Sequence, residues 1–476
     1  MTRRTATHVA RDALVVAGVG LLVRLVVVAW AAESIPPAAD GTFYDKLAVR
    51  IAEGHGYTWL WPDGVVTHAA HYPVGYPAMV ALGYAVFGAK PVVAMILNAL
   101  LGTAAGVATW SLVARASSAR LALAAGLAVA IHPVLVPYTA ALMTEGVTTS
   151  LVVVAAALAA HARVAPASRR WLVATGLVVG VATLVRPQSL ALAPVLGWLA
   201  ATGSEALAGT TASVVRRGVS AAAVVTATAL AVCAPWTVRN CARMDRCALV
   251  SVNGGWNLAI GTQTESGGWH ELTVPEACKT VFQEAAKDEC FGREALRVIA
   301  RNPGAWLARV PAKLRTTFDY FGAAPWYLHS ANAERFPYRA KVALGAIETI
   351  TSRLLLAAAL VTLLRMRVAS STIASRMRMV FAAVGLCACV VVPGTIAYLA
   401  LAAGIVSLGW RELSRAPLVV PFTAIVILAT AATHAVFFGA GRYGIVVVPF
   451  VTALAFVRRP SAEPAGAASG HFARQL

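Results

Sequence analysis

Four charged side chains lie beside apolar runs of the sequence: Asp40, Glu145, Arg186 and Arg442. A carboxylate can remove a proton from a hydroxyl or an amine while a leaving group departs. A guanidinium group binds a phosphate through paired hydrogen bonds and stays charged in a partly dry site. These residue types predict chemistry at a membrane surface, in which an acid activates an acceptor and arginines hold a phosphate.

Each of these residues also has a purely structural interpretation. Asp40 could cap a helix, a role that can coexist with proton transfer. Glu145 could form a structural ion pair, because an acid within hydrocarbon is costly unless it is paired or faces a cavity. Arg186 and Arg442 could instead reach lipid headgroups. A fifth charge, Arg24, falls in the middle of an apolar run and is expected to pair internally.

The composition is that of an integral membrane protein. Hydrophobic residues make up 59% of the chain and charged residues 13%, whereas soluble domains carry roughly a quarter charged residues. The formal net charge of +19 would suggest nucleic acid as the partner of a soluble chain. Here the arginines collect in short connections between apolar runs, as they do in cytoplasmic loops, so we expect no nucleic-acid partner.

The pattern predicts an all-α polytopic membrane protein with about twelve transmembrane helices, each crossing roughly 30 Å of hydrocarbon. The apolar runs lie at about 13–32, 91–114, 120–138, 146–162, 171–185, 187–203, 218–235, 343–364, 379–392, 393–410, 417–438 and 443–457. Three of them are short, so merging or splitting a pair would change the count by one or two. The arginine-rich connections alternate along the chain, which places both termini in the cytoplasm. We therefore expect the first run to be retained rather than cleaved as a signal peptide.

The apolar and polar segments predict four regions. These are an N-terminal transmembrane module at 1–235, a small outer subdomain at 236–342, C-terminal transmembrane helices at 343–460 and a disordered cytoplasmic tail at 461–476. The tail is rich in Ala, Gly and Ser and has too little apolar surface to fold. The first outer loop, 33–90, belongs to the N-terminal module and is expected to carry the catalytic acid.

This first outer loop contains an amphipathic pattern. Phe43, Leu47 and Ile51 share one helical face, which predicts a short helix on the membrane surface that ends at Gly54. A proline-rich turn then opens a second surface helix, up to Gly88. In the outer subdomain, the portion 279–317 predicts an amphipathic helix broken at Pro303 and Pro311.

Four cysteines of the outer segment are candidates for disulfides. On the oxidising side of a membrane, Cys241 could pair with Cys247 and Cys278 with Cys290, although spacing alone does not fix the pairing. Free buried thiols are the alternative.

Several common catalytic motifs are missing from the sequence. There is no P-loop, no glycine-rich nucleotide loop and no serine nucleophile motif, so ATP or a nucleotide sugar is not expected as the donor. No Cys or His cluster has zinc-finger spacing, and His68 with His71 is a weak pair. The energy for a transfer would then have to arrive in an activated lipid.

With these residues in view, the chain resembles the GT-C membrane glycosyltransferases, the superfamily of the protein O-mannosyltransferases and the aminoarabinose transferase of lipid A. The resemblance rests on the order of loose motifs on one side of the membrane. These are Asp40-x-x-x-Tyr44, Tyr72-Pro73-Val74-Gly75-Tyr76-Pro77, Thr144-Glu145, Val185-Arg186-Pro187, Pro235-Trp236-Thr237-Val238-Arg239-Asn240, Asn253-Gly254-Gly255 and Arg442-Tyr443.

The resemblance implies transfer of a sugar from a polyprenyl-phosphate donor to a lipid, glycan or protein acceptor, with inversion at the anomeric carbon. It assigns Asp40 as the general base and Glu145 as a secondary acid. The residues that it places in substrate binding are Tyr44, Asp45, His71, Tyr72, Arg186, Arg239, Asn240, Asn253, Arg442 and Tyr443. Relatives often carry a second acid directly after the first-loop Asp, where this chain has Gly41, so that role is in doubt or falls to Asp45. Some relatives bind a divalent metal near this loop, but no metal ligands can be assigned here.

The enzyme is expected in the cell inner or plasma membrane, with its active site on the periplasmic or extracellular side. The alternative function is a polytopic transporter of lipids or sugar-lipids. A transporter predicts polar residues spread through mid-membrane segments and repeat symmetry, whereas the polar residues of this chain gather at one face. That placement favours the enzyme. An inactive protein with the same fold is a third interpretation.

Overall fold

The computed structural model describes residues 3–164, 168–203, 210–319, 322–366, 372–391 and 394–458. The segment 461–476, predicted to be a disordered tail, lies outside the described residues. Apart from one two-stranded antiparallel hairpin, the regular secondary structure of the described part is helical. The predicted all-α fold is confirmed.

The elements have the following bounds, with η marking a 3₁₀ helix. The first half contains α1 (Arg3–Ala31), α2 (Asp40–Ala52), β1 (Thr58–Leu60), β2 (Val66–His68), α3 (Gly75–Phe87), α4 (Pro91–Ala114), α5 (Ala119–Ala130), η1 (Pro137–Ala140), α6 (Thr144–Val164), α7 (Arg169–Val185), η2 (Pro187–Ala191), α8 (Leu192–Ala201) and α9 (Thr211–Arg243). The second half contains α10 (Gly254–Gln263), η4 (Glu276–Cys278), α11 (Glu284–Arg301), α12 (Pro303–Ala308), α13 (Val310–Phe318), α14 (Ala323–Ala331), α15 (Tyr338–Arg365), α16 (Thr372–Val391), α17 (Gly394–Val406), α18 (Gly409–Arg415), α19 (Val419–Val436), η5 (Gly441–Val447) and α20 (Val448–Ala455).

Among the described residues, seven helices are long and apolar enough to cross a membrane: α1, α4, α6, α9, α15, α16 and α19. The pair α17 and α18 passes the same test together, although the two helices meet at a bend of 92°. Every apolar run predicted from the sequence overlaps a helix, so the polytopic architecture is confirmed. The remaining runs form helices that are too short or interrupted to span by themselves.

Prolines explain the interruptions closest to the charged residues. The run predicted at 120–138 is α-helical only to Ala130, shortly before Pro133. The run at 187–203 opens at Pro187 as a short 3₁₀ helix before α8 begins. Proline lacks a backbone N–H and disfavours the helical conformation in the residue before it. Accordingly Arg186, which precedes Pro187, has an extended backbone and ends α7.

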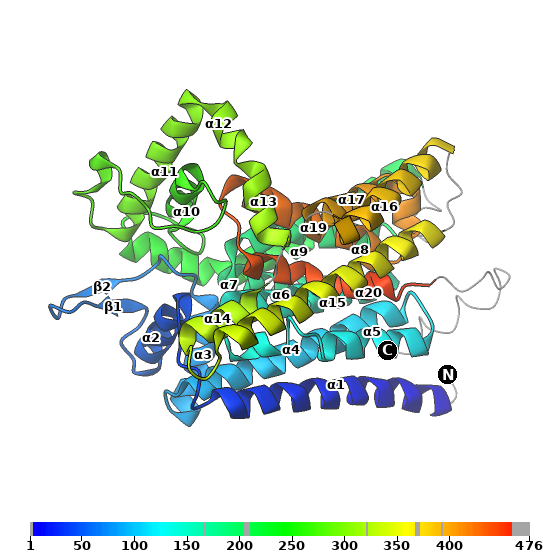
Figure 1. Cartoon of the computed structure of the whole chain (residues 1–476), viewed down its shortest axis with the longest axis horizontal. Coiled ribbons are helices and arrows are strands. Elements are labelled where there is room, and N and C mark those ends of the chain that lie inside the picture. Colours follow the sequence, from blue (N-terminus) through cyan, green and yellow to red (C-terminus); the bar gives the residue numbers. More distant parts are fainter. Residues whose placement is uncertain are drawn as a thin grey trace.

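The two polar segments lie together at one end of the helix bundle. In Figure 1, α1 begins and α20 ends at the opposite end, while α2, the hairpin, α3, α10 and α11 gather where α1 finishes. This is the arrangement expected if the segments 33–90 and 236–342 share one side of the membrane.

Arg24 connects α1 to α5 inside the bundle. Its side chain is 1% exposed, and its Nη1 donates to the carbonyl oxygens of Gly20 at 3.0 Å and Ala130 at 2.8 Å. Ala130 is the last residue of α5, where unpaired carbonyls give a helix a partial negative charge. Arg24 therefore pairs internally, as expected, but with main-chain carbonyls rather than with an acid.

Helix α2 confirms the surface helix predicted in the first outer loop. It begins at Asp40 and ends before Gly54, whose φ of 82° suits glycine. Its buried face contains Tyr44 and Leu47, whereas Phe43 is 41% exposed. The N-cap position is held by Ala39, and no side chain caps the helix. The alternative role of Asp40 as a helix cap is therefore wrong, and its carboxylate is available for other contacts.

Helix α9 is longer than the apolar run at 218–235. It continues through Pro235 to Arg243, so the stretch 236–240 is helical. The amphipathic portion 279–317 forms α11, α12 and α13. It breaks at Pro303 as predicted, but the second break falls at Arg309 and places Pro311 in the first turn of α13. Proline is tolerated there because the first helical N–H groups have no intrahelical partner.

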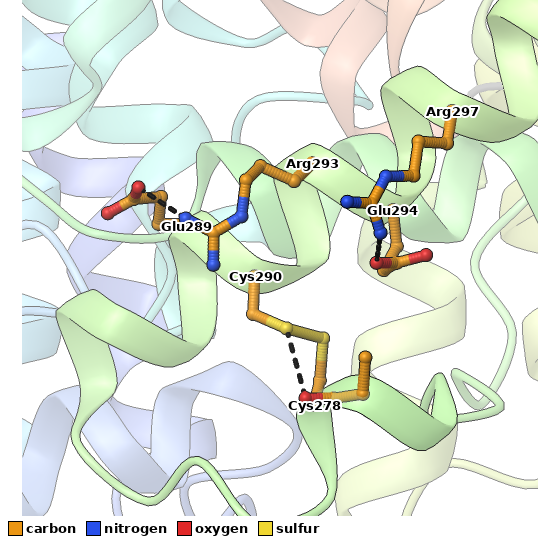
Figure 2. The surroundings of a disulfide bond; sticks show 7 residues. Cys278, Glu289, Cys290, Arg293, Glu294 and Arg297 are labelled. Atoms are coloured by element: carbon orange, nitrogen blue, oxygen red, sulfur yellow. Dashed lines mark hydrogen bonds and ion pairs between the residues drawn. A yellow bond between two sulfur atoms is a disulfide. The ribbon is translucent and has the colours of Figure 1, made fainter.

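Both candidate disulfides are present, since Cys241 is bonded to Cys247 and Cys278 to Cys290. Figure 2 shows the second bond, which fastens η4 to α11. Ion pairs line the exposed side of α11 in the same view, between Arg293 and Glu289 at 2.6 Å and between Arg297 and Glu294. Exposed pairs of this kind contribute little to stability. The covalent links and a small apolar core around Ile260 and Phe291 hold the outer subdomain together.

Candidate active site

The four charged residues identified in the sequence meet in one cluster. Arg442 bridges the two acids, with Nη2 at 3.0 Å from Asp40 Oδ2 and Nε at 3.3 Å from Glu145 Oε1. Arg186 reaches the same Glu145 oxygen through Nη1 at 3.1 Å. The cluster therefore holds two carboxylates and two guanidinium groups, contributed by four separate parts of the chain.

Helix ends position each member of this cluster. Asp40 and Glu145 lie in the first turns of α2 and α6, where the partial positive charge of a helix N-terminus favours an anion. Arg186 ends α7, where the partial negative charge of a C-terminus favours a cation. Arg442 is in the first turn of η5, whose N-cap residue, Ala440, has an extended backbone. The breaks between apolar helices thus bring the four charged side chains into contact with one another.

Aromatic side chains surround the charges and orient them. The hydroxyl of Tyr138 donates to Glu145 Oε2 at 2.9 Å, and that of Tyr72 lies 3.5 Å from Asp40 Oδ1. The ring of Tyr443 lies beneath both guanidinium groups, 4.8 Å from Arg186 and 5.2 Å from Arg442. Cations are attracted to such ring faces. His434 stacks on the ring of Tyr443, with 4.3 Å between the ring centroids.

Two tyrosines of the first outer loop, Tyr44 and Tyr72, stay protonated beside Asp40. Burial is the main cause that raises the pKa of Tyr44 and of Tyr72, and the negative charge of Asp40 raises both further. A protonated phenol can donate a hydrogen bond to a carboxylate or to a substrate oxygen. Tyr72 is thus placed as a donor to Asp40, and Tyr44 packs against the ring of Tyr72.

A pocket of about 280 Å³ opens beside the arginines, between α6, α8, α19 and η5. Its polar end contains Glu145, Arg186, Arg442, Tyr443 and His434. Its other walls are apolar over most of their surface, with Val152, Leu192, Val426, Ala429 and Val446, and also contain the polar side chains of Thr148, Gln188, Ser189, Thr430 and Thr433. Asp40 does not line this pocket but contacts Arg442, which does. A ligand with a phosphate and an apolar tail matches this division of polar and apolar surface.

Close main-chain packing holds the backbone that leads to Arg442. The N–H of Gly439 donates to the carbonyl of Gly267 at 2.8 Å, which joins this backbone to the outer subdomain. A Cβ at Gly439 would overlap the carbonyl oxygen of Lys313, and one at Gly267 would overlap Ala312. Glycine is therefore required at both positions, and the outer subdomain helps to set the place of Arg442.

The other predicted binding residues lie outside this cluster. Arg239 donates to the main-chain oxygens of Ala69 and Tyr57, each at 2.8 Å. Asn240 is fully buried and donates to the carbonyls of Ala248 and Val250, each at 3.1 Å. These contacts give both residues structural partners and attach α9 to the first outer loop and to the disulfide-bonded turn.

Three further candidates also have their contacts outside the cluster. Asp45 accepts a hydrogen bond from Tyr84 at 2.5 Å, and burial raises its pKa. Asn253 precedes α10 and accepts from the hydroxyl of Ser251 at 3.1 Å. His71 packs between Tyr72 and Trp256, and burial lowers its pKa, although Glu284, Asp288 and Asp40 oppose that shift. His71 is therefore a neutral ring near the cluster at ordinary pH.

Sequence reasoning missed Glu284, the first residue of α11. Its carboxylate accepts hydrogen bonds from Trp59 Nε1 at 2.6 Å and from the backbone N–H groups of Ala70 and His71 at 2.6 and 2.9 Å. It thereby connects the outer subdomain to the loop that carries His71 and Tyr72. Amphipathic helices often begin with an acid, so the sequence alone gives no signal that Glu284 connects these two segments.

Replacing Glu284 with Ala should lower the thermal denaturation midpoint. Three donors would lose their acceptor, and leaving such groups unpaired costs about 1–3 kcal/mol. The matched control is Glu289→Ala on the same helix, since Glu289 forms exposed ion pairs with Arg246 and Arg293 that are worth about 0–1 kcal/mol. Thermal unfolding of the purified variants measures the difference, and equal midpoints would contradict the role of Glu284.

The residues of the first outer loop do not fit a divalent metal. Within the part of the chain that the structure describes, no three His, Cys, Asp or Glu side chains gather as candidate ligands. Asp40 faces a guanidinium group, and the place of a side chain at position 41 is occupied by the hydroxyl of Tyr327 and the carbonyl of Leu142. We therefore derive no step through a metal.

Comparison with known families bears out the GT-C resemblance. Residues 71–238, about a third of the chain, match the family model described as dolichyl-phosphate-mannose-protein mannosyltransferase. This segment includes Glu145 and Arg186. A search of curated proteins finds no match.

Solved structures of membrane glycosyltransferases are also similar to this chain. The archaeal oligosaccharyltransferase AglB from Archaeoglobus fulgidus, in complex with an inhibitory peptide and a dolichol-phosphate, shares 14% identity at a TM-score of 0.46, covering 96% of this chain and 50% of that one. ArnT from Cupriavidus metallidurans bound to undecaprenyl phosphate shares 15% identity at a TM-score of 0.37, covering 96% and 78%. Its apo state gives 15% identity and a TM-score of 0.39, covering 93% and 77%. The chain spans about half the length of the archaeal enzyme.

Proposed function

We propose that this protein is a membrane glycosyltransferase that moves a sugar from a polyprenyl-phosphate donor to a lipid, glycan or protein acceptor on the non-cytoplasmic face of the cell inner or plasma membrane. One observation carries the proposal: Arg442 joins Asp40 and Glu145 at the polar end of a pocket whose other walls are largely apolar. The family model that matches 71–238 describes enzymes that use a lipid-linked sugar of this kind.

In this proposal the donor enters the pocket with its phosphate against Arg186 and Arg442 and its hydrocarbon along the apolar wall. Guanidinium groups bind phosphate oxygens through paired hydrogen bonds, and this attraction is stronger where water is excluded. The donor phosphate competes with the carboxylates for the arginines. Arg442 can then exchange its contact with Asp40 for one with the phosphate, which frees the Asp40 carboxylate.

Exposure favours Asp40 over Glu145 as the general base. The side chain of Asp40 is 34% exposed, whereas that of Glu145 is 4% exposed and contacts both arginines. An acceptor arriving from the outer side can reach Asp40 but not Glu145. We therefore assign proton removal to Asp40, and to Glu145 the task of holding the two guanidinium groups.

The transfer step follows from these roles. Asp40 takes the proton of the acceptor hydroxyl or amine, and the acceptor atom bonds to the anomeric carbon as that carbon's bond to the phosphate oxygen breaks. The electron pair leaves with the polyprenyl phosphate, whose developing charge is stabilised by the arginines. Attack opposite the leaving group inverts the anomeric centre. The proton remains on Asp40 until it passes to water.

A transfer assay tests the function directly. The purified protein in lipid nanodiscs is mixed with radiolabelled undecaprenyl-phosphate sugars and with lipid, glycan and peptide acceptors. We expect label to leave the polyprenyl lipid and to join one acceptor class, with the opposite anomeric configuration by NMR. If a fluorescent polyprenyl lipid instead crossed the bilayer of proteoliposomes with no transfer of sugar, the protein would be a transporter.

A further inference from the structure

Tyr327 connects the two loops that carry the acids of the site. It lies in α14, far along the chain from either loop, and its side chain is 1% exposed. Its hydroxyl oxygen accepts hydrogen bonds from the backbone N–H of Ala38 at 3.2 Å and of Leu142 at 3.3 Å. Ala38 stands two residues before Asp40, and Leu142 three residues before Glu145.

The backbone beside Asp40 requires such support. Ala39 has a φ of 50° and a ψ of −133°, a backbone conformation that residues other than glycine rarely adopt. Residues with this strain persist where surrounding contacts enforce it, and they concentrate at functional sites. The contacts here are the hydrogen bond from Ala38 to Tyr327 and the first turn of α2, in which Gly41 N donates to the carbonyl of Ala38 at 2.9 Å.

Gly41 is the position that allows Tyr327 to reach both loops. A Cβ there would lie 2.9 Å from the Tyr327 hydroxyl and 3.0 Å from the carbonyl oxygen of Leu142, closer than side-chain carbons pack. The acid that relatives often carry at this position would therefore displace the tyrosine. Gly41, which departs from the acid that relatives often carry, and the contact of Tyr327 with both loops are therefore linked, because a side chain at position 41 would exclude the Tyr327 hydroxyl.

Helix α14 also contacts the start of the same loop at a second point. Asn332, just beyond its last turn, donates from Nδ2 to the carbonyl of Ser34 at 2.9 Å. This contact lies farther from the acids, so it can hold the helix without setting the position of Asp40. It provides a matched comparison for the hydroxyl of Tyr327.

We propose that Tyr327 is a positioning residue whose hydroxyl, held against Gly41, sets the spacing of Asp40 and Glu145 around Arg442. The proposal rests on the sugar transfer proposed above. Tyr327 touches no substrate. It acts by fixing the backbone that precedes each acid, so that one arginine bridges both carboxylates and the freed Asp40 faces the acceptor.

Hydrogen–deuterium exchange of Tyr327→Phe in nanodiscs tests the positioning without any substrate. Loss of the acceptor should speed exchange about tenfold in the peptides that contain Ala38 and in those that contain Leu142, the effect of losing one hydrogen bond at each amide. Asn332→Ala should leave those peptides unchanged and affect the regions of Ser34, Glu334 and Arg335, whose main chain the Asn332 side chain contacts. Unchanged exchange near Ala38 and Leu142 in Tyr327→Phe would overturn the assignment.

Kinetics supply the second measurement. Misplacing a catalytic group by about 1 Å can cost about 100-fold, so Tyr327→Phe should lower kcat about 10- to 100-fold, with the KM for the undecaprenyl-phosphate sugar nearly unchanged. Gly41→Ala should reproduce the fall in kcat, and the double variant should be no slower than the slower single one, because both act through the same contact. A normal kcat in Tyr327→Phe, or a change in KM alone, would overturn the proposal. If the wild-type protein transferred no sugar, the proposed function would be contradicted instead. Hydrogen–deuterium exchange would still test the positioning by Tyr327.

Discussion

Asp40→Asn should lower the kcat of sugar transfer about 100- to 10,000-fold, which is the usual contribution of a general base. The amide preserves the size of the side chain but cannot take up the acceptor's proton. Arg442 would keep its contact with Glu145 at 3.3 Å, so the donor pocket should remain assembled. Initial rates with labelled undecaprenyl-phosphate sugar measure the effect, and binding of undecaprenyl phosphate should stay within a few fold of wild type.

The matched control for this variant is Asp63→Asn. Asp63 lies in the turn of the hairpin in the same outer loop, and its contact is a hydrogen bond from Val65 N at 3.1 Å. We expect nearly normal rates for this control. If Asp40→Asn also transferred sugar at a rate close to wild type, Asp40 would not be the base, and Glu145→Gln would be the variant to examine next.

Arg442→Ala should weaken the binding of undecaprenyl phosphate about 10- to 100-fold, because hydrogen bonds to charged groups contribute about 1.5–3 kcal/mol. Arg442 is the group that contacts both acids and lines the polar end of the pocket. Loss of its charge would leave the buried Glu145 with Arg186 as its partner, so lower stability should accompany the loss of affinity. Titration of the protein in nanodiscs with undecaprenyl phosphate measures the affinity.

Two further variants separate phosphate binding from stability. Arg442→Lys keeps the charge but loses the planar fork that reaches both acids, so its affinity should fall between those of the wild type and Arg442→Ala. Arg239→Ala removes a guanidinium group that contacts main-chain oxygens of Ala69 and Tyr57, so it should lower stability and leave phosphate affinity unchanged. If Arg239→Ala weakened phosphate binding as much as Arg442→Ala, the assignment of Arg442 would be wrong.

The sequence predicted the general design of the site because its signals are local. Charges at the ends of apolar runs are costly in hydrocarbon, so Asp40, Glu145, Arg186 and Arg442 could be placed near one face of the membrane before any contact was known. Helical spacing predicted the surface helix α2 in the same way, and the structure confirms it.

Local signals were weaker guides in two places. The stretch that contains Arg239 and Asn240 is polar and follows an apolar run, yet it continues α9, and both side chains donate to main-chain carbonyls. Asp is a favoured N-cap, yet Ala39 holds that position and leaves Asp40 free to contact Arg442. In both cases tertiary contacts outweighed a weak local preference.

The sequence by itself determined the class of fold, the side on which polar residues gather and the types of group available for chemistry, since these depend on hydrophobicity and residue type along short stretches. Only the tertiary structure decided that Arg442 lies between Asp40 and Glu145, that Asp40 is the more exposed acid, and that Tyr327 joins their loops. Those facts depend on contacts between segments far apart in the chain. Helix packing brings such segments within hydrogen-bonding distance, and no local pattern encodes which of them will meet.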